Sequence, residues 1–348
     1  MNYIVLDLEW NQCPAGKARE NPALPFEIVE IGAVRLDDNR VWMDSFNERI
    51  RPQVYRKFHY RTKEILHMDM EELRNARTFP QVVRDFLDWC GTDCEFCSWG
   101  PLDLMELQRN MEFYRIANPF PFPLLYYDVQ KLFSLLYEDG KSRRSLEDAV
   151  NFLNIVKAMP FHRAIDDTYY TAEIIRRMDW KKVERYRSVD YYRLPSERAD
   201  EIHLQFGRYA KYVSRIFSGR EEALRDKEVT STRCYECGAR MKRLLPWFGV
   251  SSRQYLSLNQ CPVHGLVKGK LRVKKTTDDR VFIVKTLKRI GEEEAGVIRM
   301  QQENVKKRRG EGGQGTSSLQ NPVEQPCLTG KEEDLESVSQ VKKDTAGL

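Results

Sequence analysis

The sequence lacks an apolar run long enough to cross a membrane. Its N-terminus also lacks the uninterrupted apolar stretch of a secretory signal, because Asp7 and Glu9 fall within it. Its eight cysteines do not suggest a disulfide framework in a chain of 348 residues, and clustered cysteines in a reducing compartment more often bind metal. These absences predict a cytoplasmic protein with no membrane partner.

A large net charge is absent as well. The formal net charge is only +5, although 31% of the residues are charged, and hydrophobic residues make up 41%. That composition is typical of globular proteins. A chain of 348 residues exceeds one ordinary core, so we expect roughly two domains plus tails.

The opening stretch, residues 3–10, has the pattern of a core strand but carries two carboxylates. Side chains two residues apart in a strand point to one face, so Asp7 and Glu9 project together, away from the neighbouring leucines. Burying two adjacent acids is unfavourable unless a cation neutralises them, and oxygen ligands suit Mg²⁺ or Mn²⁺. For this stretch alone, an edge strand with one solvated face is the alternative.

The rest of the first half alternates between strand and helix patterns. Residues 26–36 and 41–46 read as two further strands, and residues 62–91 have the apolar spacing of two helices. Alternation across residues 1–180 predicts an α/β layer domain. Glu30, in the second strand, could lie near the acidic pair, but a lone acid on a half-exposed strand is more often solvated, so it is interpreted as an acid outside the site.

Two later stretches bring further acids and a histidine. Asp103 follows the strand-like segment 95–99, where taken alone it is more simply a helix N-terminal acid. His162 precedes Asp166 and Asp167 in a loop that runs into an amphipathic helix. Spacing alone leaves either of these two acids as a candidate ligand, because it does not determine where the helix begins.

Acids and a histidine in this combination suit metal-assisted phosphodiester hydrolysis. Carboxylates hold divalent ions, and two such ions can clamp an in-line displacement at phosphorus. Histidine titrates near neutral pH and can take the proton from an attacking water. The candidate set is Asp7, Glu9, Asp103, His162 and one of Asp166 and Asp167.

The order and spacing of these residues resemble the three exonuclease motifs of the DEDDh superfamily, which includes the proofreading subunit of bacterial DNA polymerase III, ribonuclease T and oligoribonuclease. The matching pieces are Asp7-Leu8-Glu9, Asp103 after Trp99-Gly100, and His162 with Asp167 five residues later. The resemblance covers about the first half of the chain. Within the superfamily the chain looks most like the bacterial sporulation-inhibitor branch and the eukaryotic relatives that trim RNA 3′ ends.

The resemblance implies an RNase H-like fold, a mixed sheet flanked by helices, and 3′→5′ hydrolysis of single-stranded nucleic acid to nucleoside 5′-monophosphates with two Mg²⁺ or Mn²⁺ ions. It assigns Asp7 to bridging both ions, Glu9 and Asp167 to direct coordination, Asp103 to a mainly water-mediated role and His162 to the general base. It also selects the second of the two adjacent acids. RNA is preferred to DNA on resemblance alone.

Residues 181–229, which follow the exonuclease pattern, are rich in Tyr, Arg and Lys. Apolar residues at Ile202, Phe206, Val213 and Phe217 suggest an amphipathic helix. The stretch is therefore expected to be a helical linker to the module that follows.

Four soft metal ligands come next, in two pairs. Cys234 and Cys237 form a C-x₂-C pair, and after 23 residues Cys261 and His264 form a C-x₂-H pair. Pairs of this kind are typical of a zinc ribbon, in which two knuckles hold one tetrahedral Zn²⁺. A closed four-ligand site is structural, so this zinc is expected to take no part in hydrolysis.

The segment around these ligands is the basic end of the chain, with fourteen Lys or Arg against three acids between Arg233 and Arg289. Such a module suits single-stranded nucleic acid, and docking of a protein partner is the alternative. Beyond residue 291 large apolar residues are few, which predicts a disordered tail. The expected domains are an exonuclease (1–180), a helical linker (181–229), a zinc ribbon-like domain (230–290) and the tail (291–348).

Two functions are compatible with these patterns. The main hypothesis is a metal-dependent 3′→5′ exonuclease, and the alternative is a non-catalytic nucleic-acid-binding or adaptor protein that acts through its zinc ribbon. The complete set of acids together with His162 favours the enzyme, because a binding module does not need five groups in a catalytic arrangement.

Overall fold

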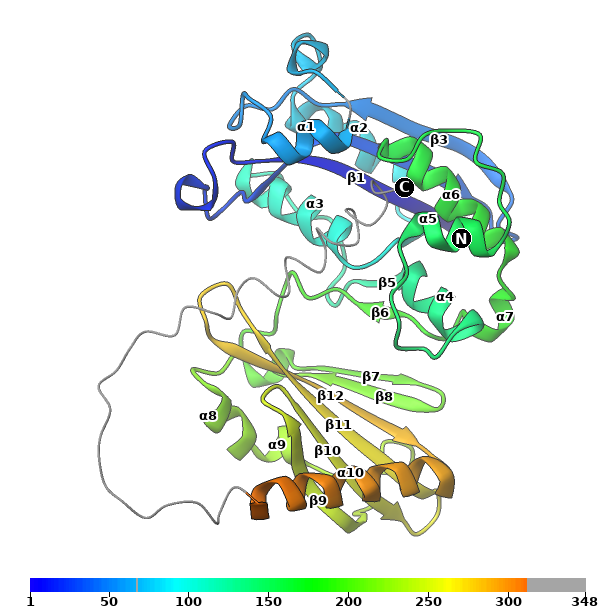
Figure 1. Ribbon diagram of the computed structural model, residues 1–348, viewed down its shortest axis with the longest axis vertical. Coiled ribbons are helices and arrows are strands. Elements are labelled where there is room, and N and C mark those ends of the chain that lie inside the picture. Colours follow the sequence, from blue (N-terminus) through cyan, green and yellow to red (C-terminus); the bar gives the residue numbers. More distant parts are fainter. Residues whose placement is uncertain (67, 312–348) are drawn as a thin grey trace. The chain divides into compact units, whose positions relative to one another are not determined.

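A computed structural model describes residues 1–66 and 68–311, except for the side chains of residues 308–311 (Figure 1). The chain divides into two compact units, one formed by Met1–Arg193 and one that begins at Leu194. Each unit is built around its own six-stranded sheet. Among the described residues, no helix is both long enough and apolar enough to cross a membrane.

The first unit contains a mixed sheet. Its strands are β1 (Asn2–Gln12), β2 (Phe26–Leu36), β3 (Trp42–Arg49), β4 (Cys94–Ser98), β5 (Leu125–Asp128) and β6 (Ser188–Val189). The strand order is β3-β2-β1-β4-β5-β6. β1, β2 and β3 are antiparallel neighbours, as predicted, whereas β4 and β5 run parallel to β1. Three antiparallel strands followed by parallel crossovers form the RNase H-like arrangement, which confirms the expected fold class.

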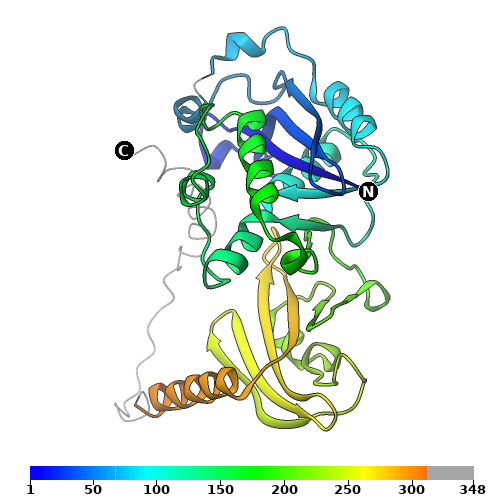
Figure 2. The ribbon, with the colours of Figure 1, turned by 90° about the vertical axis from the view of Figure 1, so that its right-hand side faces the viewer.

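Helices cover both faces of this sheet (Figures 1 and 2). They are α1 (Tyr60–Leu66), α2 (Phe79–Cys90), α3 (Leu102–Phe113), α4 (Val129–Tyr137), α5 (Leu146–Phe152), α6 (Ala164–Arg177) and α7 (Trp180–Val183). Tyr3 and Val5 of β1 pack in a core cluster with α4, α5 and α6, whereas Ile4, Leu6 and Leu8 pack in a second cluster with α2 and α3. The alternation along β1 therefore directs Asp7 and Glu9 to the face that α6 covers.

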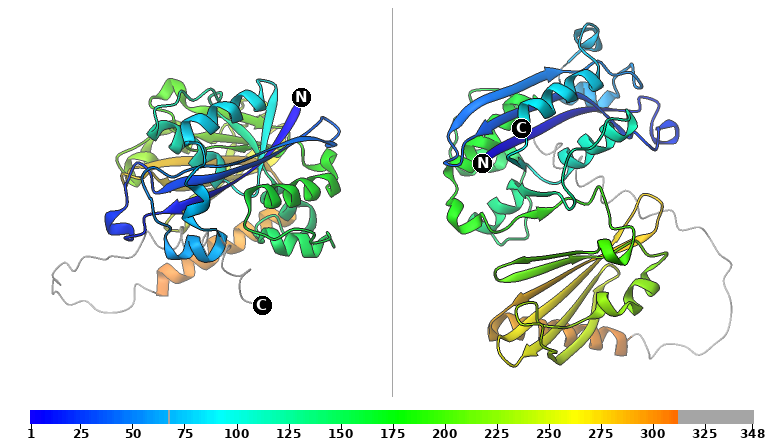
Figure 3. Two further views of the ribbon diagram at one scale, coloured as in Figure 1. Left: turned by 90° about the horizontal axis from the view of Figure 1, so that it is seen from above. Right: turned by 180° about the vertical axis from the view of Figure 1, so that it is seen from behind.

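The second unit is an antiparallel sheet. Its strands are β7 (Ile202–Phe206), β8 (Tyr209–Val213), β9 (Lys242–Ser251), β10 (Gln254–Cys261), β11 (Gly265–Lys275) and β12 (Val281–Arg289), in the order β7-β8-β12-β11-β10-β9. The short helices α8 (Arg220–Arg225) and α9 (Lys227–Thr230) supply Ala223 and Val229 to one core cluster. A longer helix, α10 (Glu292–Glu311), contributes to another cluster, and the view from behind in Figure 3 shows α8 and α9 on the side of the sheet away from α10.

The helix expected around residues 202–217 is wrong, because this segment forms the β7–β8 hairpin. Gly207 adopts a left-handed φ of 56° at the turn, and Phe206 pairs with Tyr209 across it. β8 then pairs with β12, where Val213 lies opposite Val284. This pairing with a strand far along the chain decides against the helix, since the apolar residues that suggested one fit strand alternation equally well. Residues 181–229 are therefore only partly helical.

The start of the expected disordered tail is also wrong, because Glu292–Glu311 forms α10. The helix is held on the sheet by a small number of apolar residues. Ala295 and Ile298 are 0% and 1% exposed and pack in a cluster with Leu258. The first turn carries three glutamates, which the helix dipole favours at that end. The rest of the expected tail, 312–348, lies outside the described residues.

Candidate functional site

The acidic pair lies at the centre of the first sheet. Glu9 is buried and Asp7 is half-buried in β1. Glu9 lies opposite Glu30 of β2, and the register shifts immediately afterwards, so that Trp10 lies opposite Ile28. A shift of this kind bends a strand and re-aims its side chains, and it is frequent beside functional sites.

Helix α6 approaches this face unusually closely at Gly32. Gly32 lies opposite Asp7, and a Cβ atom placed on it would come within 2.3 Å of the backbone carbon of Ala164 and the backbone nitrogen of Ile165. Thr168 Oγ1 also donates a hydrogen bond to the Gly32 carbonyl at 3.1 Å. Only glycine permits this contact, and the contact seats the first turns of α6 over the acidic pair.

Three carboxylates meet at this contact. One oxygen from each of Asp7, Glu9 and Asp167 lies within 4.8 Å of the others. The adjacent Asp166 is not in this group; burial raises its pKa, against the effect of Arg163. Three acids gathered this closely repel one another unless cations neutralise them, so the cluster fits divalent metal ions.

The fourth predicted acid, Asp103, lies in the first turn of α3 and is also buried. Its Oδ1 accepts a hydrogen bond from the backbone N–H of Leu8 at 3.2 Å. Asp103 therefore contacts the strand between Asp7 and Glu9 without belonging to the group of mutually close oxygens. One turn later, burial raises the pKa of Glu106 to about 7, although its ion pair with Arg109 at 2.8 Å acts in the opposite direction.

His162 lies at the entrance of α6 in a strained conformation. Its φ is 70°, in the left-handed region that side chains other than glycine rarely adopt. Its backbone N–H donates to Asp167 Oδ2 at 3.2 Å, so the histidine backbone is tied to the acidic cluster. Strain of this kind persists only where the surroundings hold it, and it is concentrated at functional sites.

Two functional candidates were not recognised from the sequence. Glu30, interpreted as solvated, is 0% exposed, so that interpretation is wrong. Its two carboxylate oxygens accept hydrogen bonds from Arg163 Nη2 and Nε at 3.2 and 3.3 Å. No sequence signal joins residues so far apart, although an acid within an apolar strand pattern was an indication of burial.

Arg163 also lines a surface cavity of about 640 Å³. The other lining residues are Asn47, Glu48, Arg49, Glu72, Asn75, Ala76 and Arg77. Arg49 pairs with Glu72 at 2.8 Å and Arg77 with Glu48 at 3.1 Å. The cavity wall is therefore mostly polar, with three arginines and two glutamates, and it includes the residue that follows His162.

The cysteine cluster lies in the second unit, where two turns meet. Cys234 Sγ is 3.5 Å from His264 Nδ1, Cys237 Sγ is 3.6 Å from Cys261 Sγ, and Cys261 Sγ is 3.7 Å from His264 Nδ1. Ligands about 2.3 Å from a central zinc form a tetrahedron with edges of roughly 3.8 Å. The four side chains therefore fit one tetrahedral Zn²⁺.

The surroundings of the cluster favour metal binding. Burial opposes ionisation of Cys261, but backbone hydrogen bonds from His264 and Val263 lower the pKa of its thiol to about 6. Glu236 Oε2 lies 3.6 Å from the second ring nitrogen of His264. A carboxylate at that position orients a metal-binding histidine, which the ligand spacing alone did not indicate.

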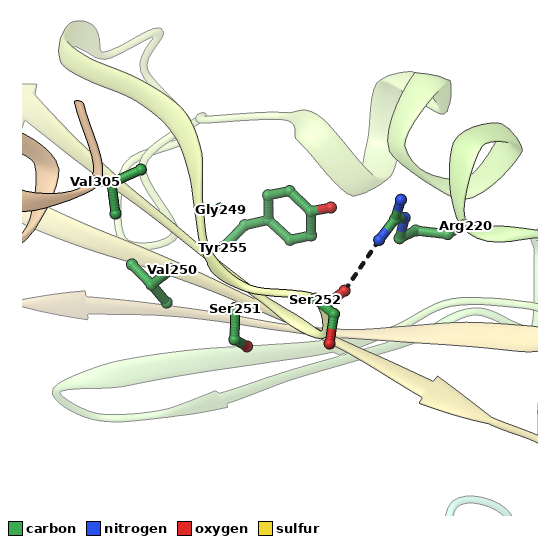
Figure 4. Close-up of a pocket in the computed structure, with 7 residues that line it drawn as sticks. All are labelled: Arg220, Gly249, Val250, Ser251, Ser252, Tyr255 and Val305. Carbon is green, nitrogen blue, oxygen red and sulfur yellow. Dashed lines mark hydrogen bonds between the residues drawn. The ribbon is translucent and has the colours of Figure 1, made fainter. Parts of the chain in front are cut away.

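A second cavity, of about 430 Å³, lies at the β9–β10 turn (Figure 4). The residues that line it are Arg220, Gly249, Val250, Ser251, Ser252, Tyr255 and Val305. Arg220 donates to the Ser252 carbonyl at 3.3 Å. None of these described lining residues is an acid, a cysteine or a histidine.

Comparisons with known proteins concern the first unit. Residues 4–175 match the family model described as exonuclease. A PolC-type DNA polymerase III from Clostridium perfringens (strain 13 / Type A) is 26% identical over 182 residues, 52% of this chain and 11% of the polymerase. The 3'-5' exoribonuclease 1 of Homo sapiens is 24% identical over 189 residues, 51% of this chain and 52% of the relative.

Among solved structures, the nuclease domain of 3'hExo, described as a DEDDh family member bound to rAMP, has a TM-score of 0.46 at 20% identity. The match covers 55% of this chain and 96% of that domain. This chain spans about half of the human relative and a small part of the polymerase. All five candidate catalytic residues lie within the family match, and the cysteine cluster lies after it.

Proposed function

We propose, from the match of residues 4–175 to the exonuclease family model, that the protein is a metal-dependent 3′→5′ exonuclease. It acts on single-stranded nucleic acid and releases nucleoside 5′-monophosphates. The observation that carries the proposal is the meeting of Asp7, Glu9 and Asp167, with the backbone of His162 hydrogen-bonded to the last of them.

The proposed roles of the residues combine this geometry with the resemblance to DEDDh exonucleases. Asp7, Glu9 and Asp167 would hold two Mg²⁺ or Mn²⁺ ions, and Asp103 would act beside them from its contact with β1. When bound, such ions neutralise the phosphate charge and stabilise the leaving oxygen. His162 takes the proton from the attacking water while the water oxygen bonds to phosphorus and the bond from phosphorus to the 3′ oxygen breaks.

The preference for RNA over DNA rests on the relatives. One relative is named an exoribonuclease and the other a DNA polymerase. The names of the relatives therefore point to RNA in one case and to DNA in the other. The wider resemblance to enzymes that trim RNA 3′ ends favours RNA.

The second unit would hold one structural zinc through Cys234, Cys237, Cys261 and His264. A reducing compartment such as the cytoplasm would keep these thiols available. β11 places Lys270, Arg272 and Lys274 on the face away from buried Leu271 and Val273, whereas Lys268 on the same face pairs with Glu294 of α10 at 3.0 Å. That charge suits the phosphate backbone of the substrate, and a docked protein partner is the alternative.

The test is degradation of matched RNA and DNA single strands, labelled at the 3′ or the 5′ end, with Mg²⁺, Mn²⁺ or EDTA. We expect 3′-terminal monophosphates only with metal, faster release from RNA, no release by Asp7→Asn, and a strongly reduced but measurable release by His162→Ala. Binding without release under all these conditions would contradict the enzyme and support the adaptor hypothesis.

A further inference from the structure

Arg163 connects two parts of the catalytic unit that are far apart in sequence. It is the residue between His162 and the first turn of α6, and its guanidinium donates to both oxygens of Glu30 at 3.2 and 3.3 Å. Two parallel N–H···O bonds to one carboxylate fix direction as well as distance. The side chain of Arg163 is 31% exposed and that of Glu30 is 0% exposed, so the pair joins a residue of the cavity wall to a fully buried carboxylate.

Glu30 is the fixed end of this pair. It lies in β2 between two neighbours, opposite Glu9 of β1 on one side and Arg49 of β3 on the other. The strands on both sides hold its backbone, and its carboxylate is completely buried. The ion pair therefore attaches the residue after His162 to the strand that neighbours the metal-ligand pair.

The conformation of His162 requires such an attachment. Within the described part of the chain, the other non-glycine residues with positive φ lie in turns or directly after helix ends; they are Arg40, Arg115, Asn154 and Asp279. His162 instead precedes a helix, in a segment that leads into the acidic cluster. Left-handed backbone at such a residue is unfavourable, and the surroundings must hold it.

The segment around His162 is held at both ends. Upstream, Tyr170 accepts a hydrogen bond from the Met159 N–H at 3.0 Å and donates one to its carbonyl at 2.6 Å. Downstream, the seat of α6 on Gly32 fixes the helix, and the Glu30–Arg163 pair fixes the residue immediately after the histidine. His162 thus lies between two anchors, of which the ion pair is the nearer.

We propose that the Glu30–Arg163 ion pair is a positioning device that holds His162 in its left-handed conformation beside the acidic cluster. The inference rests on the proposed function, because it assumes that His162 acts as the general base. Neither residue touches the reacting atoms; both act through the histidine. Loss of the pair should lower kcat about 10–100-fold, the range typical of residues that orient a catalytic group, with little change in KM.

The test is a double-variant cycle in the full chain with labelled RNA and Mn²⁺. We expect Arg163→Met to lower kcat in the wild-type background and to have almost no further effect in the His162→Ala background, because only the histidine transmits the loss. Arg163→Lys keeps the charge but not the paired geometry, so its kcat should lie between those of the wild type and of Arg163→Met. Mn²⁺ affinity, followed by electron paramagnetic resonance, should not change.

Arg49→Met is the matched control, because Arg49 lines the same cavity and pairs with an acid but is not adjacent to His162. An equal loss of kcat in this control, or equal losses from Arg163→Met with and without His162, would overturn the inference. If the methionine variant does not fold, the cycle is run with Arg163→Lys and the same criteria hold. Failure of the proposed function itself is recognised separately, by His162→Ala retaining full activity.

Discussion

The two units gather metal-type ligands in opposite ways. In the first, oxygen ligands come from distant segments, with Asp7 and Glu9 in β1 and Asp167 in α6. In the second, sulfur and nitrogen ligands come from two nearby turns, between Cys234 and His264. The acidic cluster therefore depends on the whole unit folding around it, whereas the cysteine cluster depends only on the ends of adjacent strands.

The difference has a consequence for what each metal does. The carboxylates meet because a sheet and a helix are already packed together, so the fold does not require the ions, and the ions are available for chemistry. The thiols meet at short loops, where Cys234 and Cys261 pack in a small cluster with Met241, Val267 and Leu287. A bound zinc commonly supplies folding energy at such a site. The comparison would be contradicted if the acidic cluster proved necessary for folding and the cysteine cluster for hydrolysis.

The largest effect is expected at the acidic cluster. Asp7→Asn should lower hydrolysis by several orders of magnitude, because it removes a charge from the group that holds the ions, and it should leave thermal unfolding nearly unchanged. Activity with Mg²⁺ and a thermal melt measure the two outcomes. A large drop in Tm with partial activity would show that this cluster, too, is structural.

The cysteine cluster should show the reverse. Cys234→Ser combined with Cys261→Ser should abolish binding of one zinc per chain and melt the second unit, while the first unit still degrades a short oligonucleotide. Zinc content and circular dichroism check the first result, and a nuclease assay checks the second. Loss of hydrolysis in a chain whose first unit remains folded would make zinc part of the catalytic apparatus.

Glycine-to-alanine substitutions should have opposite effects on stability in the two units. Gly32→Ala should destabilise the first unit by about 1–3 kcal/mol and lower activity, because its Cβ would displace α6 and with it Asp167. In α10 of the second unit, Gly296 has open space around it, and Gly296→Ala should stabilise the protein by up to about 1 kcal/mol. Denaturant unfolding of both variants measures the change in the free energy of unfolding, which should fall for Gly32→Ala and rise for Gly296→Ala.

A further contrast between the two units is expected in their pH dependence. Burial raises the pKa of Glu106 from its ordinary 4.5 to about 7, so the stability of the first unit should fall as pH rises from about 4.5 to 7. Burial lowers the pKa of Lys285 from 10.5 to about 8, so the stability of the second unit should rise between about pH 8 and 10.5.

Glu106→Gln and Lys285→Met test these slopes. Each variant should remove the dependence in its own pH window and leave the other window unchanged. Melting temperatures measured across pH 4–11 give the comparison, and identical profiles for wild type and variant would refute the assignment for that residue.

Patterns with a local cause were predicted correctly. Strand alternation placed Asp7 and Glu9 on one face, and ligand spacing paired Cys234 with Cys237 and Cys261 with His264. The hairpin at 202–213 and the helix at 292–311 were not predicted, because partners elsewhere in the chain decided both. The hairpin pairs with β12, where Val213 lies opposite Val284, and Ala295 and Ile298 of the helix pack in a hydrophobic cluster on the sheet.

By itself, the sequence determined the chemistry available to this protein: carboxylates and a histidine in one half, thiols and positive charge in the other. The tertiary structure alone decided which groups meet. Asp167 rather than Asp166 joins the acidic pair because α6 rests on Gly32. Glu30 is buried against Arg163 because β2 and the start of α6 pack together. Spacing along a chain describes neighbours within an element, but contact between elements depends on the packing of the whole unit.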